Sequence, residues 1–163
     1  MKNILLVAFL FLPSLVYANS SLEKSEFVYD TSGEIRDDFR NATNQGKILV
    51  YSFEQIGCAY CLYMHEKVYT DPIVSKLMEK KFYFVQVDMR SSQAIYQYKE
   101  GLNYSRSSLA KTLGAFGSPT YVFFKSDSDF NDIHNLVDSV AFKLDGALHK
   151  DIFIKILTER MGD

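Results

Sequence analysis

The chain has 163 residues, with 18 Lys and Arg, 20 Asp and Glu, and a formal net charge of −2 at pH 7. This mild balance argues against nucleic acid or an anionic membrane surface as the partner. The length fits one domain with a real hydrophobic core, and the chain carries only two cysteines, close together in the sequence.

The N-terminus has the layout of a secretory signal peptide. Lys2 precedes an apolar run from Ile4 to Leu12, and Ala18 stands before polar residues at the expected cleavage position. The run is shorter than the roughly 20 apolar residues of a membrane span, so we expect export, cleavage and no stable membrane insertion afterwards. A retained membrane anchor is the alternative. The predicted division is a signal peptide at 1–18 and one domain at 19–163.

The first elements of that domain are a helix and a strand. We interpret residues 19–30 as irregular, and the spacing of Ile35 and Phe39 predicts a helix that ends near Gly46. A continuous apolar run over 47–53 predicts a strand that is buried on both faces.

A second helix should begin at the cysteine pair and run toward Lys80, with a kink at Asp71-Pro72. A strand over 82–88 follows. It would lie parallel to the first strand, because the helix between them can serve as the crossover connection.

The last part of the chain is predicted to add a partly helical insertion at 89–105, a helix, two strands and a closing helix. In order, these four are a helix capped by Ser107-Ser108 and ending at Ala115, a strand over 120–124, a strand at about 136–142 after a polar loop at 126–135, and a helix with Leu148, Ile152, Ile156 and Leu157 on one face. The short loop makes the two strands an antiparallel hairpin. The whole predicts an α/β fold: a central mixed β-sheet flanked by helices, with an N-terminal helix and an insertion after the second strand.

The two cysteines, Cys58 and Cys61, are separated by only two residues. A structural disulfide usually closes a long loop, because it stabilises mainly by restricting the unfolded chain. This pair closes almost no loop, so reactivity explains it better than stability. The N–H groups at a helix N-terminus favour a thiolate, so Cys58 should be the more acidic and more exposed thiol, with Cys61 one turn deeper.

The cysteine pair gains specificity from Gly117 to Thr120, which lead an apolar strand later in the chain. The stretch from Phe53 to Cys61, continued by Met64-His65 and Asp71-Pro72, resembles the exported thioredoxin-like proteins encoded with bacterial sulfur-oxidation systems, the SoxW-like group. The resemblance covers roughly residues 34–160 and implies the thioredoxin fold. It also implies a periplasmic thiol–disulfide oxidoreductase in which Cys58 attacks, Cys61 resolves and Pro119 is the cis-proline beside them.

Three further residues are candidates for the site. A small residue before Pro119 favours a cis peptide bond, and a trans proline at the start of a strand is the alternative. Ser118 would offer its backbone groups to an extended substrate. Ser52 and Gly57 stand where thioredoxin has a buried aspartate and a tryptophan, so we consider Glu54, the nearest carboxylate in sequence, for proton transfer. The alternative is a solvated or structural Glu54.

No metal and no cofactor are expected. Cys58, Cys61 and His65 would supply three ligands without a fourth nearby, and Leu62 stands where covalent haem attachment needs a histidine. We therefore interpret His65 as a surface or half-buried helix residue. The expected partners are protein thiols and disulfides, together with a membrane electron donor that recharges the protein.

The main hypothesis is an exported reductase of protein disulfides that works by dithiol/disulfide exchange. A disulfide oxidase or isomerase is the first alternative, since potential and partners set the direction. A non-catalytic thioredoxin-fold binding module with a permanently closed bridge is the second. Tyr60, between the cysteines, adds little to thiolate stability, so together with the family resemblance it predicts that the resting pair is largely in the thiol form.

Overall fold

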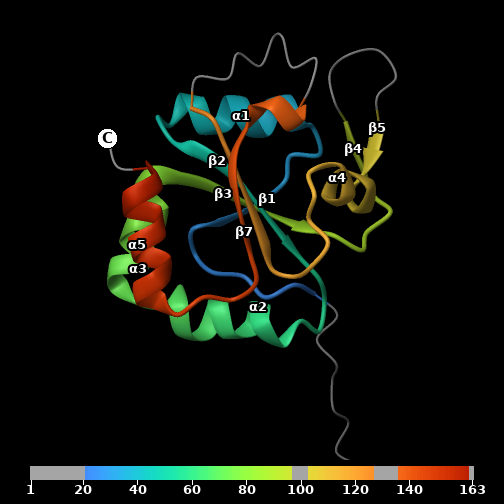
Figure 1. The fold of residues 1–163 in the computed structure, drawn as a ribbon. Coiled ribbons are helices and arrows are strands. Elements are labelled where there is room, and N and C mark those ends of the chain that lie inside the picture. Colours follow the sequence, from blue (N-terminus) through green and yellow to red (C-terminus); the bar gives the residue numbers. More distant parts are fainter. Residues whose placement is uncertain (1–20, 97–102, 127–135, 162–163) are drawn as a thin grey trace, which may run out of the picture.

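The computed structural model describes residues 21–96, 103–126 and 136–161, and the predicted signal peptide at 1–18 and most of the polar loop at 126–135 lie outside this part. Within it the elements are β1 (Val28–Asp30), α1 (Ile35–Asn44), β2 (Ile48–Glu54), α2 (Ala59–Tyr63), the π-helical η1 (Met64–Val68), α3 (Pro72–Lys81), β3 (Phe82–Asp88), β4 (Ala94–Tyr96), β5 (Asn103–Ser105), α4 (Arg106–Thr112), β6 (Thr120–Phe124), the 3₁₀ turn η3 (Leu136–Ser139), β7 (Val140–Asp145) and α5 (Lys150–Met161) (Figure 1). None of the described helices is long and apolar enough to cross a membrane.

A five-stranded mixed sheet forms the centre of the fold, in the order β1-β3-β2-β6-β7. Strand β2 pairs in parallel with β3, from Ile48 opposite Phe82 to Glu54 opposite Asp88, and antiparallel with β6. Strand β7 pairs antiparallel with β6 at one edge, and β1 pairs in parallel with β3 at the other. The predicted parallel pairing of the two apolar strands and the antiparallel C-terminal hairpin are therefore confirmed.

Helices cover both faces of the sheet. Successive side chains of a strand point to opposite faces, so each strand contributes side chains to two cores. Tyr51 and Phe53 of β2 belong to a core that includes α1 and α4. Val50 belongs to a second core, which includes η1, α3 and α5. By the same alternation, Ser52 and Glu54 face the second side, where the helix that carries the cysteines lies.

The cysteine-bearing helix is interrupted where Asp71-Pro72 predicts a break. Helix α2 continues through η1 to Val68, and α3 starts anew at Pro72. The Asp71 carboxylate caps α3 by accepting hydrogen bonds from the backbone N–H groups of Ile73 and Val74. It also forms an ion pair with Lys150, 2.7 Å away at the start of α5. This contact lowers the pKa of Asp71 and ties α3 to α5.

The insertion after β3 differs from the prediction of a partly helical segment. Its described residues form a two-stranded hairpin, in which β4 pairs antiparallel with β5. Ile95 is fully buried and anchors the hairpin in the core beside α1 and α4. The cap of α4 is Ser105, whose hydroxyl accepts the N–H of Ser108, so the predicted cap at Ser107-Ser108 lies too far along the chain.

The segment before α1 is more ordered than the predicted irregular residues 19–30. Strand β1 adds an edge to the sheet beside β3, and Val28 is buried. Phe27 packs edge-on against the rings of Tyr69 and Phe84, with centroids 5.3 and 5.7 Å away. These contacts hold the N-terminal segment against the face that carries the cysteine helix.

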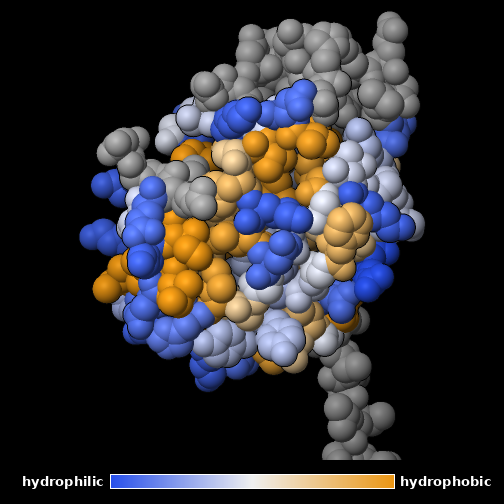
Figure 2. All heavy atoms as spheres, in the orientation of Figure 1, coloured by the Kyte–Doolittle hydropathy of each residue, from blue (hydrophilic) through white to orange (hydrophobic). Residues whose placement is uncertain are grey.

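Two C-terminal predictions are wrong in detail. The strand predicted at about 136–142 begins only at Val140, because residues 136–139 form the 3₁₀ turn. Helix α5 buries Phe153 and Leu157, whereas Ile152, which the predicted apolar face included, is 50% exposed. In the space-filling view, apolar side chains gather over β7 and α5 with polar ones around them (Figure 2).

Candidate active site

Cys58 and Cys61 form a disulfide, with Cα atoms 5.2 Å apart. Cys58 is the residue that precedes α2, and its sulfur accepts a hydrogen bond from the backbone N–H of Cys61 at 3.1 Å. The same N–H can stabilise a thiolate at Cys58. Cys58 is half-buried, whereas Cys61 is only 3% exposed, so an incoming sulfur atom reaches Cys58 more easily.

The loop before β6 lies directly against the disulfide. Its Ser118–Pro119 peptide bond is cis. The Ser118 hydroxyl lies 3.0 Å from the sulfur of Cys61 and 3.4 Å from that of Cys58, and its carbonyl oxygen lies 3.5 Å from the Cys58 sulfur. The structure thus brings together the two motifs that the sequence singled out, and Ser118 provides the polar groups because Pro119 has no N–H.

Gly57, immediately before the cysteines, has a φ angle of +78°. An L-residue with a side chain is strained in this left-handed region, although no heavy atom lies within 4 Å of where its Cβ would be. The backbone therefore favours glycine at the position where thioredoxin carries tryptophan.

Glu54, the last residue of β2, is buried, with 1% of its surface exposed. Its Oε1 accepts a hydrogen bond from the Ser52 hydroxyl at 2.7 Å, and its Oε2 accepts one from the Gln86 amide at 3.0 Å. His65 Nε2 lies 3.1 Å from Oε2. The solvated alternative for Glu54 is wrong, and three polar neighbours offset the cost of burying its carboxylate.

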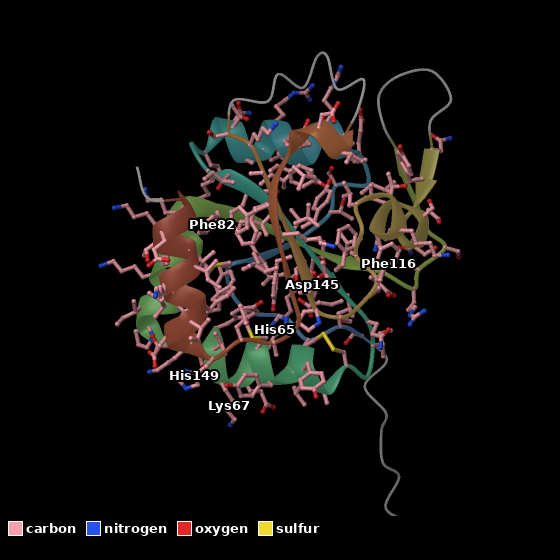
Figure 3. The ribbon with its side chains drawn as sticks, in the orientation of Figure 1. His65, Lys67, Phe82, Phe116, Asp145 and His149 are labelled. Atoms are coloured by element: carbon pink, nitrogen blue, oxygen red, sulfur yellow. A yellow bond between two sulfur atoms is a disulfide. The ribbon has the colours of Figure 1, made fainter. Side chains whose placement is uncertain are left out.

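His65 belongs to η1 and is 6% exposed, so its interpretation as a surface or half-buried residue is wrong. It lies on the inner side of the helix, facing the sheet, while Lys67 points outward (Figure 3). Its Nδ1 lies 2.9 Å from the Ser25 hydroxyl, and its ring meets Tyr69 edge-on at 5.0 Å. Both ring nitrogens therefore have polar partners.

Glu54 shares a cavity with the disulfide. The cavity has a volume of about 460 Å³, and its walls include Glu54, Cys58 and Cys61. Leu22 and Ile56 supply apolar wall on the same side. Glu54 and Cys61 are thus a buried acid and a buried thiol that line the same cavity.

The partners of Glu54, which are Ser52, Gln86 and His65, were not predicted from the sequence. The signal was present in the strands: Ser52 and Glu54 interrupt an apolar run two residues apart, and Gln86 interrupts the next strand. Residues two apart on a strand share a face, so the interruptions predict a buried polar cluster. His65 gives no such signal, because its burial depends on how the helix packs.

Among residues 21–96, 103–126 and 136–161 there is no group of three or more His, Cys, Asp or Glu that could hold a metal ion. His65 is bonded to Glu54 and Ser25, which occupies both of its ring nitrogens.

A mixed sheet with helices on both faces, a disulfide at the start of a helix and a cis-proline against it define a protein of the thioredoxin-fold class. A model of the thioredoxin-like domain family matches residues 35–159, so the chain belongs to that family. A comparison with curated proteins found no significant match.

Solved structures with the same fold come from several bacteria. The solution structure of a thioredoxin from Thermus thermophilus has a TM-score of 0.59 and 22% identity, with 83% of this chain and 86% of that chain covered. A thioredoxin-fold protein from Helicobacter pylori has a TM-score of 0.55 and 14% identity, with 86% and 78% covered. The oxidised DsbD C-terminal domain of Neisseria meningitidis has a TM-score of 0.50 and 21% identity, with 76% and 88% covered.

Proposed function

We propose that this protein is an exported thiol–disulfide oxidoreductase that reduces disulfides in other proteins through Cys58 and Cys61. The observation that carries the proposal is the half-buried Cys58 paired with a buried Cys61, with Ser118 within hydrogen-bond distance of both sulfurs. A structural bridge needs no such asymmetry. An exchange reaction needs this asymmetry, because the attacking sulfur must be accessible to the substrate while the resolving sulfur stays shielded until the mixed disulfide has formed.

The reaction takes two exchange steps. The Cys58 thiolate attacks one sulfur of a substrate disulfide, forms a mixed disulfide and releases the other substrate sulfur as a thiolate. Cys61 then loses its proton and attacks the Cys58 sulfur, which closes the Cys58–Cys61 disulfide and releases the second substrate thiolate. The substrate gains two electrons, the protein loses two, and the substrate thiolates take up protons from solvent.

We assign to Glu54 the role of exchanging a proton with the thiol of Cys61. The two residues line one cavity, and Glu54 is held there by Ser52 and Gln86 rather than turned to solvent. The carboxyl group of Glu54 takes up the thiol proton when Cys61 attacks and supplies a proton when the disulfide is reduced again.

Acceleration of insulin reduction by dithiothreitol tests whether the pair is catalytic. We expect the protein to shorten the lag before insulin precipitates, and the Cys58→Ser variant to show only the rate of dithiothreitol alone, because attack on insulin disulfides begins at this sulfur. Turbidity at 650 nm is the measurement. Equal lag times with and without the wild-type protein would favour the non-catalytic binding module.

The working direction is tested by the redox state in cells. We expect most of the Cys58–Cys61 pair to be in the thiol form, since a reductase is kept reduced by its electron donor. Alkylation of acid-quenched cells with a reagent that adds mass to each thiol, followed by immunoblotting, measures the fraction. A fully oxidised pair would favour the oxidase alternative and contradict the reductase direction.

The location, the subgroup and the donor belong to the same proposal. The signal-peptide pattern at 1–18 supports export to the periplasm, and the motif around Cys58 supports placement with the SoxW-like group. A periplasmic reductase needs electrons that originate inside the cell, so its donor is a membrane protein that presents a reactive thiol pair outside.

A further inference from the structure

Glu54 and His65 lie between two separate cavities. Glu54 faces the cavity that holds the cysteines. His65 faces a second cavity of about 380 Å³, whose walls include Ser25, Tyr69 and Thr70. The two side chains meet at 3.1 Å, so a continuous line of polar atoms crosses the wall between the cavities.

The N-terminal strap, residues 21–27, forms the outer part of this wall. Ser21, Leu22 and Glu23 line the cysteine cavity, and the residues from Lys24 to Phe27 line the second one. The strap is fixed where it crosses, because the Gln86 amide donates to the carbonyl oxygen of Glu23 at 2.6 Å. The Ser25 hydroxyl is thereby held at the outer nitrogen of His65.

We propose that Glu54, His65 and Ser25 form a proton relay that connects Cys61 with the water of the second cavity. The proposal rests on the function proposed above and adds His65 and Ser25 to its machinery. A relay is needed because a substrate protein docked on Cys58 covers the mouth of the cysteine cavity while Cys61 must still lose its proton.

When a dithiol donor reduces the disulfide, the proton moves inward. The donor supplies two electrons, and the sulfur of Cys61 leaves as a thiolate that takes the proton of Glu54. Glu54 takes the proton of His65 Nε2 while His65 Nδ1 accepts one from the Ser25 side, and Ser25 is reprotonated from water. His65 ends with its proton on Nδ1, and one proton has entered.

When Cys61 later attacks the mixed disulfide, the same atoms work in reverse. Glu54 passes its proton to the free Nε2 of His65 and takes up the thiol proton in its place, and the Nδ1 proton leaves through the Ser25 hydroxyl. His65 returns to its starting tautomer, and one proton has left. A serine hydroxyl suits the outer end because it both donates and accepts.

The two tyrosines beside the relay do not compete for its proton. Burial raises the pKa of Tyr69 and of Tyr121, with Glu54 adding to both shifts, so these phenols stay protonated at physiological pH. Ser52 and Gln86 only donate to Glu54. Lys24 and Glu26 line the second cavity and are exposed, so they lie on its solvent side.

The test uses the reduced protein and one equivalent of 5,5′-dithiobis(2-nitrobenzoate). The first release of coloured thiolate reports attack by Cys58, and the second reports attack by Cys61 on the mixed disulfide. We expect Ser25→Val to slow the second release at neutral pH about 100-fold, the lower end of the range for general acid–base catalysis, and Ser25→Thr to restore most of the lost rate. Valine and threonine have nearly the same shape, so this pair isolates the hydroxyl.

His65→Gln should slow the second release further and flatten its pH dependence, while the first release is unchanged. His149→Gln is the matched control, since His149 is exposed at the start of α5, far from the disulfide (Figure 3). Added imidazole should restore the second release in His65→Ala, which a merely structural role would not allow.

Equal second-phase rates in Ser25→Val and Ser25→Thr would overturn the relay and leave the proposed function standing. Absence of the first release in the wild type would overturn the proposed function itself.

Discussion

In a Cys61→Ser variant, substrate proteins should accumulate as covalent adducts on Cys58. The half-buried Cys58 can still attack a substrate disulfide, but the serine hydroxyl that replaces the buried thiol cannot attack the resulting mixed disulfide. Release is blocked, and the adduct survives until a reductant is added. Non-reducing and reducing gels of a tagged variant, with mass spectrometry of the bands that differ, measure the adducts and name the substrates.

A Cys58→Ser variant is the matched control, because it keeps the buried thiol and loses the accessible one. It should capture nothing, and the double variant should behave like it. If Cys58→Ser traps as many proteins as Cys61→Ser, the roles of attacker and resolver are assigned wrongly. The same conclusion follows if neither variant traps a protein while the wild type still reduces insulin.

The parts of the site that could be predicted are those with a strong local signal. The runs that became β2 and β3 are too continuously apolar to have a solvent-exposed face, which is typical of parallel strands covered on both sides. The cysteine pair follows the first run directly, and Ser118-Pro119 directly precedes β6. Once the order of the elements is known, the topology alone brings the two motifs to the same end of the sheet.

The parts that could not be predicted depend on tertiary contacts. Strand β1 has only three residues, and it is a strand because β3 offers an open edge and because Phe27 packs against Tyr69. A segment this short carries too little periodicity to be distinguished from a loop. The burial of His65 likewise follows from the packing of η1 on the sheet and of the N-terminal strap over both.

The closing helix shows why a correct element can be given a partly wrong face: of the predicted residues Leu157 is buried but Ile152 is exposed, and the buried Phe153 was not included. Leu148, Ile152 and Ile156 repeat every four residues, and so do Phe153 and Leu157. Both series satisfy helical periodicity, and they lie about 100° apart around the axis. The structure chooses the second series, because Phe153 reaches the rings of Tyr69 and Tyr121, with centroids 6.0 and 5.8 Å away.

Phe153→Ala should therefore lower the free energy of unfolding by about 3–5 kcal/mol, the cost of removing a fully buried phenylalanine and leaving a cavity. The control is Ile152→Ala, next to it in sequence and 50% exposed, which should change the stability by no more than about 0.5 kcal/mol. Guanidinium unfolding of the oxidised proteins, followed by circular dichroism, measures both. The cavity would open beside Tyr69, which contacts His65, so Phe153→Ala should also weaken the packing that holds His65 in the site. Equal losses in the two variants would contradict the orientation of α5.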